Sequence, residues 1–390
     1  MFQTQDERRD WQENANYFII VNMKILANDL KRQYELYAPE FEQKALDVLR
    51  GGWYVLGQEV TAFEREFADW IGAKYCVGLG SGLDALWISF RLLGIGPGDE
   101  VIVSSNAYIA CVMGITMNGA TPVFVESDRY FNMDASQIEA AVTPRTKAIL
   151  AVHLFGQTCD MTEVMRIAEK YGLKVVEDCA QSHGNHWRGK TAGTFGSVGC
   201  FSFYPTKGCG AFGDAGAIVT DDEELARKFR VFRNYGSEKK YYNSMVGTNS
   251  RLDELQAGLL RVRLSHMSEL NAERVRLASR YSSLVRNPLI EIPAVRSGAD
   301  CVWHQYVIRS PRREQLMAWL ESREIGSIIH YPIPPYLSQA YQYLGLCKGS
   351  FPFTEQAADE VLSLPMYNGM TEAEQDQVIE ALNEFRGKAE

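Results

Sequence analysis

Apolar residues recur at helical spacing soon after the first two dozen positions of the chain. Between positions 28 and 50 they fall every three or four residues, which predicts one helix with an apolar face formed by Leu30, Tyr34, Tyr37, Phe41, Ala45 and Leu49. Gly51 and Gly52 are expected to end this helix, and a second helix is predicted over 58–67. The preceding segment, 1–22, begins with charged and polar residues and is interpreted as an N-terminal extension outside the fold.

From position 75 onward, short apolar runs alternate with helical patterns. Strands are predicted over 75–79, 100–104, 121–125, 148–152 and 174–177, and helices over 83–93, 107–117, 135–141 and 161–171 lie between them. Such alternation indicates an α/β protein with a mostly parallel sheet and helices on both faces. Ligands bind at the carboxyl ends of the strands in such sheets, so the loops that follow the strands are the places to look for chemistry.

The pattern changes after residue 193. Short apolar runs over 197–203 and 216–220 precede a charged helix over 223–233, a long helix over 251–285, a strand over 303–308 and a helix over 313–323. A chain of 390 residues suggests two or three domains. We therefore expect a large α/β domain over 23–255 and a smaller α+β domain over 256–390.

Composition narrows the class of protein. The chain is 46% hydrophobic and 23% charged, as in folded proteins, and its net charge is −9 without a basic stripe, which argues against binding to nucleic acid. Its longest uncharged apolar stretch, 107–117, is too short to span a bilayer. None of the eight cysteines forms a C-x-x-C pair or a zinc-like cluster with histidine. We expect reduced thiols, no metal site and a cytoplasmic location.

Three segments at predicted strand ends carry candidate chemistry. The first is glycine-rich, G-L-G-S-G-L-D-A-L over 78–86, and opens a predicted helix. Free amides at a helix N-terminus suit a phosphate, although a tight turn alone would also need small residues. The second, V-V-E-D-C-A-Q-S-H-G over 175–184, places Asp178 at a strand end. This carboxylate is able to hold a positively charged ring nitrogen or to cap a helix.

The third segment is C-F-S-F-Y-P-T-K-G over 200–208, in which Lys207 follows apolar and aromatic residues. Burial would depress the pKa of this amine and make it a nucleophile toward a carbonyl carbon, whereas a surface lysine in a glycine loop is the alternative. A phosphate turn, an acid and then a lysine occur in the order needed to hold pyridoxal phosphate. In this interpretation Asp178 keeps the pyridine nitrogen protonated, Lys207 carries the aldehyde as an imine, and Ser202 adds a hydroxyl to the phosphate.

Four motifs together resemble the DegT/DnrJ/StrS family of sugar-nucleotide aminotransferases, which are fold type I pyridoxal phosphate enzymes. They are E-D-C-A-Q-S-H-G over 177–184, F-S-F-Y-P-T-K over 201–207, G-D-A-G-A-I-V-T over 213–220 and N-S-R-L-D-E-L-Q-A over 249–257. The resemblance covers about residues 23–385. Thr206, Leu83 and Ala107 depart from the residues that the family usually has, but none of them removes a catalytic group.

The resemblance implies a role for individual side chains. Lys207 is implied to be the catalytic residue, and Asp178 and Gln181 to contact the pyridine nitrogen and the phenolic oxygen. Ser202 and the amides of Gly82 and Leu83 are implied to hold the phosphate. Tyr108 matches a residue that stacks on the ring. Asn249 matches a residue that reaches the phosphate of the neighbouring subunit, which implies a homodimer with shared active sites.

Further segments resemble enzymes that aminate C3 of dTDP-linked 3-keto-6-deoxyhexoses: G-W-Y-V-L-G over 52–57, N-Y-G-S-E-K-K-Y over 234–241 and I-H-Y-P-I-P over 329–334. The resemblance makes L-glutamate the expected amino donor and His183, His330 and Tyr331 expected substrate contacts, while a structural role for His330 stays open. The alternatives are a 4-keto sugar nucleotide, a keto-cyclitol or an amino-dehydroquinate-type substrate, and a non-catalytic regulator that binds pyridoxal phosphate.

Overall fold

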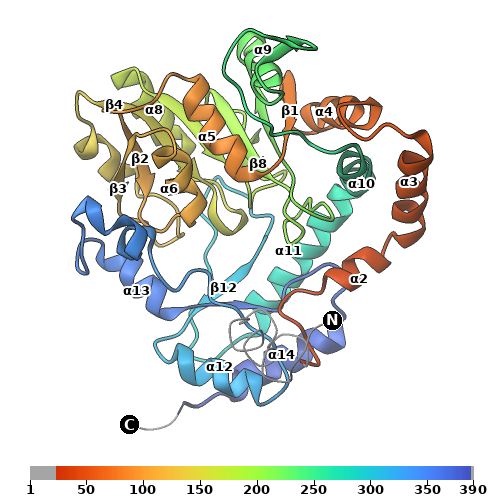
Figure 1. Cartoon of the computed structure of the whole chain (residues 1–390). Helices are drawn as coiled ribbons and strands as arrows, with labels where there is room; N and C mark the ends of the chain where they lie inside the picture. The colour runs from red at the N-terminus through yellow and green to blue at the C-terminus, as the bar shows by residue number, and fades with distance from the viewer. Residues whose placement is uncertain (1–22, 388–390) are drawn as a thin grey trace, which may run out of the picture.

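The computed structural model describes residues 23–387, so the predicted extension over 1–22 lies outside the described residues. A seven-stranded sheet with the order β1-β9-β8-β5-β4-β2-β3 forms the centre of the large domain (Figure 1). Its strands are β1 (Tyr75–Leu79), β2 (Glu100–Ser104), β3 (Thr121–Val125), β4 (Thr146–Val152), β5 (Lys174–Asp178), β8 (Val198–Ser202) and β9 (Gly216–Thr220). Only β9 runs antiparallel to its neighbours in this sheet, which confirms the predicted mostly parallel arrangement.

Helices cover both faces of this sheet because its strands are apolar on both sides. In β4, Leu150 and Val152 pack with α5 (Gly82–Leu92) and α6 (Ile109–Thr116), whereas Ile149 and Ala151 pack with α8 (Met161–Tyr171). The remaining helices of this part of the chain are α2 (Leu30–Glu35), α3 (Ala38–Gly51), α4 (Gln58–Ile71), α7 (Ala135–Ile138), α9 (Glu223–Phe232) and α10 (Glu254–Ser265). Side-chain alternation in β4 thus divides the core into two layers.

Two predicted helices are each divided in the structure. The helix predicted over 28–50 is wrong as a single element, because Pro39 has no N–H and its ring would clash with the carbonyl group of Glu35. The helix predicted over 251–285 begins only at α10 and breaks at His266 before α11 (Met267–Leu284). The His266 ring stacks on Tyr37 with ring centroids 3.8 Å apart, a tertiary contact that no local pattern predicts.

A second core lies below the sheet in the view of Figure 1 and contains α11, α12 (Arg313–Glu321) and α14 (Glu372–Glu384). An antiparallel pair, β12 (Tyr306–Arg309) with β13 (Val361–Leu364), completes this smaller α+β unit. The strand predicted over 303–308 therefore begins later than expected. Ile25 packs into this second core, while α10 packs on α3 and α4. The division into 23–255 and 256–390 stays a prediction.

Short elements connect the larger ones. They are β6 (His186–Trp187), β7 (Lys190–Thr191), β10 (Ser237–Lys239), β11 (Tyr242–Asn243), α13 (Pro352–Glu360) and the 3-10 turns Glu139–Ala141, Leu154–Gly156, Pro335–Leu337 and Gln339–Leu344. All eight cysteines of the chain are free thiols, and seven of them are buried. Among residues 23–387, no helix is both long enough and apolar enough to cross a membrane.

Candidate active site

Asp178 is the last residue of β5 and pairs in register with Val152 of β4 and Cys200 of β8, in the middle of the sheet. Its carboxylate is buried, with 7% of the residue exposed. The Cys111 thiol of α6 donates a hydrogen bond to Oδ2 at 3.0 Å, and the Ala180 amide donates to Oδ1 at 3.0 Å. These two bonds fix the orientation of the Asp178 carboxylate at the carboxyl edge of the sheet. The sequence predicts a carboxylate at this place as the partner of a ring nitrogen.

Lys207 follows β8 in a short loop whose backbone is held by a hydrogen bond from the Lys207 amide to the Tyr204 carbonyl at 2.8 Å. Desolvation lowers the pKa of the Lys207 amine, while the negative charge of Asp178 opposes that shift. A lysine with a lowered pKa yields the neutral amine more readily, and the neutral amine is the form that attacks a carbonyl carbon. The structure therefore gives Lys207 the environment that a nucleophilic amine needs.

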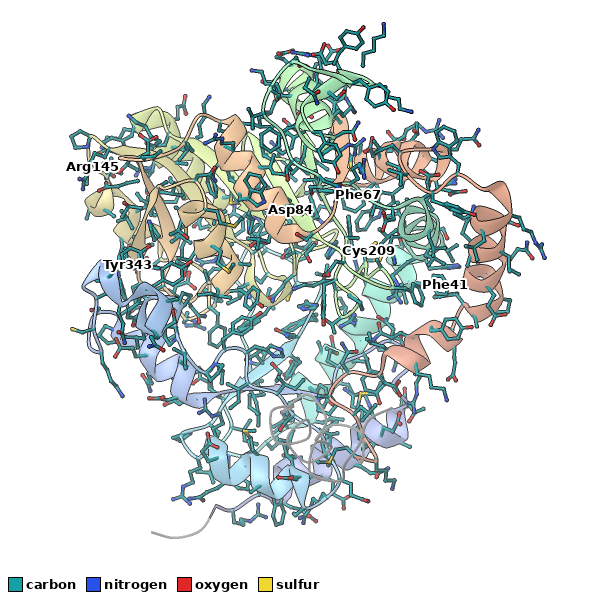
Figure 2. The ribbon with its side chains drawn as sticks, in the orientation of Figure 1. Phe41, Phe67, Asp84, Arg145, Cys209 and Tyr343 are labelled. Atoms are coloured by element: carbon teal, nitrogen blue, oxygen red, sulfur yellow. The ribbon has the colours of Figure 1, made fainter. Side chains whose placement is uncertain are left out.

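The glycine-rich turn leads into α5 at the same edge of the sheet. Ser81 caps the helix by accepting a hydrogen bond from the amide of Asp84 at 3.1 Å, and Asp84 lies in the first turn of α5 (Figure 2). A Cβ on Gly82 would lie 2.5 Å from the Cβ of Ser202, so only glycine allows this close approach. The first amides of α5, from Gly82 and Leu83, have no partner within the helix. With the adjacent Ser202 they form a cradle suited to a phosphate.

Gln181, Tyr331 and Tyr108 form one wall of the site. The side-chain oxygen of Gln181 accepts a hydrogen bond from the Phe155 amide at 2.6 Å, and its Nε2 donates to the Tyr331 hydroxyl at 3.1 Å. The second hydrogen on Nε2 is left for a ligand, because an amide nitrogen carries two. The rings of Tyr108 and Tyr331 lie 4.9 Å apart at 34°, and Tyr108 is 46% exposed.

Two imidazoles, buried His183 and half-buried His330, lie near the lysine. Burial and, secondly, the charge of Lys207 lower the pKa of His183 to about 3 and that of His330 to about 4. The ring of His330 shares a hydrogen bond of 2.8 Å with Ser363 Oγ. His183 Nε2 is buried and has no hydrogen-bond partner among the described residues. Both rings are neutral around pH 7 and add no competing positive charge to the site.

Asn249 is not brought together with these residues in the contacts that the structure shows. It is exposed, and its side-chain amide donates to the Tyr235 hydroxyl at 2.9 Å. The next residue, Ser250, accepts a hydrogen bond from the Gly80 amide at 3.0 Å and donates to Asp84 at 2.8 Å. The role of Asn249 toward a neighbouring subunit stays a prediction.

Sequence reasoning missed two residues of the site. Cys111 lies one helical turn after Tyr108, and this spacing was an available signal that it faces the same edge of the sheet. His304 is buried, and burial followed by the charges of Lys207 and Arg274 lowers its pKa well below the ordinary value. It precedes β12 in the second core, and nothing in the local sequence around it indicates that it lies near Lys207.

These groups fit pyridoxal phosphate. The cradle at α5 brings backbone amides beside the Ser202 side chain, as a phosphate needs, Asp178 is able to pair with a protonated ring nitrogen, and Gln181 retains a hydrogen-bond donor. Lys207 supplies an amine of lowered pKa beside them. None of these groups needs a metal ion to contact the cofactor in this way.

Comparison with known proteins places the chain in a family. The model of the DegT/DnrJ/EryC1/StrS aminotransferase family matches residues 36–383. The chain is 49% identical to the dTDP-3-amino-3,6-dideoxy-alpha-D-galactopyranose transaminase of Aneurinibacillus thermoaerophilus over 92% of this chain and 98% of the relative. The chain belongs to this aminotransferase family, as its motifs predicted.

Solved structures agree with this assignment. The structure of DesV from Streptomyces venezuelae in complex with a ketimine intermediate is similar with a TM-score of 0.90 and 45% identity, and the match covers 92% of this chain and 98% of DesV. The pyridoxal phosphate form of a sugar aminotransferase from Streptococcus pneumoniae is similar with a TM-score of 0.84 and 27% identity, over 88% of this chain and 95% of that one. The predicted aminotransferase fold is confirmed.

Proposed function

We propose that this aminotransferase moves an amino group from L-glutamate to C3 of a dTDP-linked 3-keto-6-deoxyhexose and forms a dTDP-3-amino-3,6-dideoxyhexose. Pyridoxal phosphate is its cofactor, as in the solved family member above. The observation that carries the proposal is the juxtaposition of buried Asp178 and a lysine of lowered pKa at the carboxyl edge of the sheet. The 49% identity to a transaminase named for such a sugar supports the substrate class.

Each predicted residue has a task in this proposal. When bound, pyridoxal phosphate supplies a conjugated ring that stabilises negative charge on the carbon that loses a proton. Asp178 would hold the proton on the ring nitrogen, and Gln181 would donate to the phenolic oxygen through the hydrogen that Tyr331 does not use. Ser202 and the amides of Gly82 and Leu83 would hold the phosphate, and Tyr108 would cover the ring.

Lys207 is the catalytic residue of the proposal. Its amine would hold the cofactor through the aldehyde carbon, with loss of water, and when free would accept and return a proton at the reacting carbon atoms in both half-reactions. Because burial lowers the pKa of this amine, a larger fraction of it is neutral and able to accept a proton than in an exposed lysine. His183, His330 and Tyr331 are proposed to contact the sugar or the amino donor. Neutral rings of His183 and His330 offer hydrogen bonds there without adding charge.

We further propose a homodimer in the cytoplasm. Large apolar side chains are exposed on two segments near the edge of the large domain, at Trp53 (67%), Tyr54 (52%), Tyr241 (85%), Tyr242 (67%) and Val246 (92%). A second copy of the chain would bury them, and Asn249 would then reach the phosphate of the neighbouring site. This arrangement would produce active sites shared between two subunits.

The test is an absorbance spectrum of the purified protein with pyridoxal phosphate, recorded before and after L-glutamate. We expect a visible cofactor band that glutamate abolishes. Adding the dTDP-linked 3-keto-6-deoxyhexose should restore the band and yield the 3-amino sugar by mass spectrometry. Borohydride reduction followed by peptide mass spectrometry should place the cofactor on Lys207.

The controls separate the parts of the proposal. Lys207→Ala should lose turnover, whereas the exposed Lys190→Ala should keep it. Turnover in Lys207→Ala would refute the catalytic assignment. A band that persists with glutamate would refute the donor, and turnover of a 4-keto but not a 3-keto sugar would refute the position of amination.

A further inference from the structure

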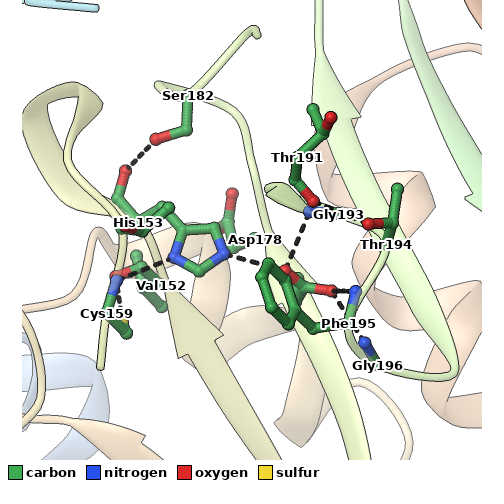
Figure 3. A network of polar contacts seen from close by, with 12 residues as sticks. Val152, His153, Cys159, Asp178, Ser182, Thr191, Gly193, Thr194, Phe195 and Gly196 are labelled. Carbon is green, nitrogen blue, oxygen red and sulfur yellow. Dashed lines mark hydrogen bonds and ion pairs between the residues drawn. The ribbon is translucent and has the colours of Figure 1, made fainter. Parts of the chain in front are cut away.

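Glu177 precedes Asp178 in β5, is fully buried and is not used by the proposed reaction. Its side chain points to the opposite face of the strand. Figure 3 shows His153, Gly193, Phe195 and Gly196, which surround its carboxylate. Glu177 accepts hydrogen bonds from four N–H groups. Its Oε1 accepts from the amides of Phe195 at 2.7 Å and Gly196 at 2.8 Å, and its Oε2 accepts from the amide of Gly193 at 2.8 Å and from His153 Nε2 at 3.0 Å. All four partners donate, so this pattern requires the ionised carboxylate.

His153 follows β4 and is satisfied on every side. Its Nδ1 accepts the amide of Cys159 at 3.1 Å, which places the ring proton on Nε2 for donation to Glu177. Its backbone amide donates to the carbonyl of Asp178 at 3.0 Å, and its carbonyl accepts from the hydroxyl of Ser182 at 2.7 Å. His153 therefore ties β4 to both residues at the end of β5.

The same cluster contains ligand types that a metal ion would accept, namely His153, Glu177 and Cys179. Both ring nitrogens of His153 and both oxygens of Glu177 are committed to hydrogen bonds within the protein. Burial raises the pKa of the Cys179 thiol to about 12, so this sulfur keeps its proton. The cluster is a satisfied polar network rather than a metal site.

Close packing leaves this network no room to adjust. A Cβ on Gly196 would lie 2.3 Å from the carbonyl oxygen of Val175, and one on Gly193 would lie 2.8 Å from the ring of Phe201. The loop over 193–196 is thus pressed against β5 and β8 while its amides point at Glu177. β8 begins two residues later and leads to Ser202 and Lys207.

We propose that Glu177 is a positioning residue that joins the carboxyl ends of β4 and β5 to the loop that leads into β8, and thereby aims Asp178 at the ring nitrogen of the cofactor. Successive residues of a strand point to opposite faces, so anchoring Glu177 sets the direction of the Asp178 side chain. The inference rests on the proposed function, because it takes Asp178 as the partner of that nitrogen.

The test compares Glu177→Gln with the wild-type holoenzyme. Glutamine has the same shape, but its NH2 group would face two N–H donors of the network, and a buried unpaired donor is costly. We expect pyridoxal phosphate to bind about 10- to 100-fold more weakly, which is the size of effect expected from one buried unpaired donor. We also expect the pH titration of the visible cofactor band to shift. In turnover, kcat should fall more than KM for glutamate rises.

Val164→Ala is the matched control. Val164 is fully buried in α8 within the core on the same face of the sheet, so its truncation lowers stability through a cavity without touching Glu177. It should lower Tm but leave the affinity and the titration unchanged. Equal effects of Glu177→Gln and Val164→Ala would overturn the proposal, as would an unchanged Glu177→Gln enzyme.

Two further variants complete the design. Glu177→Asp keeps the charge and should recover part of the affinity, and it takes the place of Glu177→Gln if that variant does not fold. In that case, the proposal would be overturned if Glu177→Asp had the wild-type affinity for pyridoxal phosphate and its cofactor band titrated as in wild type. Asp178→Asn should shift the titration more than any Glu177 variant. If Asp178→Asn leaves the pH titration of the cofactor band unchanged, Asp178 is not the partner of the ring nitrogen, whatever result the Glu177 variants give.

Discussion

At the scale of single residues, the site consists of charged groups whose neighbours restrict their direction or their proton affinity. Asp178 receives one hydrogen bond on each oxygen, from Cys111 and from Ala180. The Lys207 amine loses proton affinity through burial. The motifs around Asp178 and Lys207 single out both residues because a carboxylate and a lysine at strand ends are groups that pyridoxal phosphate chemistry needs. Their roles toward the cofactor stay a prediction.

The thiol of Cys111 is expected to support the carboxylate of Asp178. Cys111→Ala removes the donor to Oδ2 and should lower kcat about 3- to 10-fold, which matches the loss of one ordinary hydrogen bond, because a thiol is a weak donor. Cys111→Ser retains an O–H donor and should stay closer to wild type. Steady-state kinetics of the two variants tests this, and equal rates for alanine and serine would contradict it.

Stability should fall in mild acid because of the buried histidines. His183 and His330 have pKa values of about 3 and about 4 in the folded state, below the ordinary value near 6.5 of an unfolded histidine. Below about pH 6.5 the unfolded chain therefore binds more protons, and each histidine removes up to about 1.4 kcal/mol of unfolding free energy per pH unit.

His330→Asn should therefore make the free energy of unfolding less dependent on pH between about 6.5 and 4 than it is in wild type. Denaturant unfolding at several pH values measures this slope. His266→Asn is the control, since that ring lies at the junction of α10 and α11 and stacks on Tyr37. An identical slope in wild type and His330→Asn would contradict the prediction.

At the scale of elements, carboxylates from distant segments decide where helices begin. Glu254, at the start of α10, accepts hydrogen bonds from the amides of Gly57 at 2.7 Å, Glu59 at 2.9 Å and Val60 at 2.9 Å. It thereby caps α4, whose own N-cap residue is Gly57 without a side chain. The local sequence predicted the helix, but its cap lies on another part of the chain.

Glu254→Ala should reduce the free energy of unfolding by about 1–3 kcal/mol, because three amides at the start of α4 lose their acceptor. Chemical denaturation measures the change. Glu314→Ala, whose side chain is 75% exposed in α12, should alter stability by less than about 0.5 kcal/mol. A Glu254→Ala protein as stable as Glu314→Ala would show that water replaces the cap.

At the scale of the whole molecule, the site lies where the sheet, the second core and the proposed neighbouring subunit meet. His304 and His330 come from the part of the chain beyond α11, yet the charge of Lys207 influences both rings. The exposed aromatic side chains at 53–54 and 241–242 are the surface that the proposed second subunit would cover.

Val246→Asp should weaken the proposed dimer, because this side chain is 92% exposed in one chain and would be covered in two. Sedimentation analysis should show a shift toward monomer together with loss of turnover. Val295→Asp provides the control, since Val295 is 42% exposed in a different segment and should leave the dimer intact. A wild-type protein that sediments as a monomer would refute the dimer itself.

The sequence by itself determined the α/β class, the bounds of several strands and the aminotransferase family. It also made Asp178, Gln181 and Lys207 the predicted cofactor residues. These features are local, since they depend on side-chain period and on motifs that surround single strand ends. The tertiary structure alone decided the break at His266, the cap that Glu254 provides and the place of His304 beside Lys207. Each of these depends on contacts between residues far apart in the chain, and such contacts leave no periodic trace in the sequence.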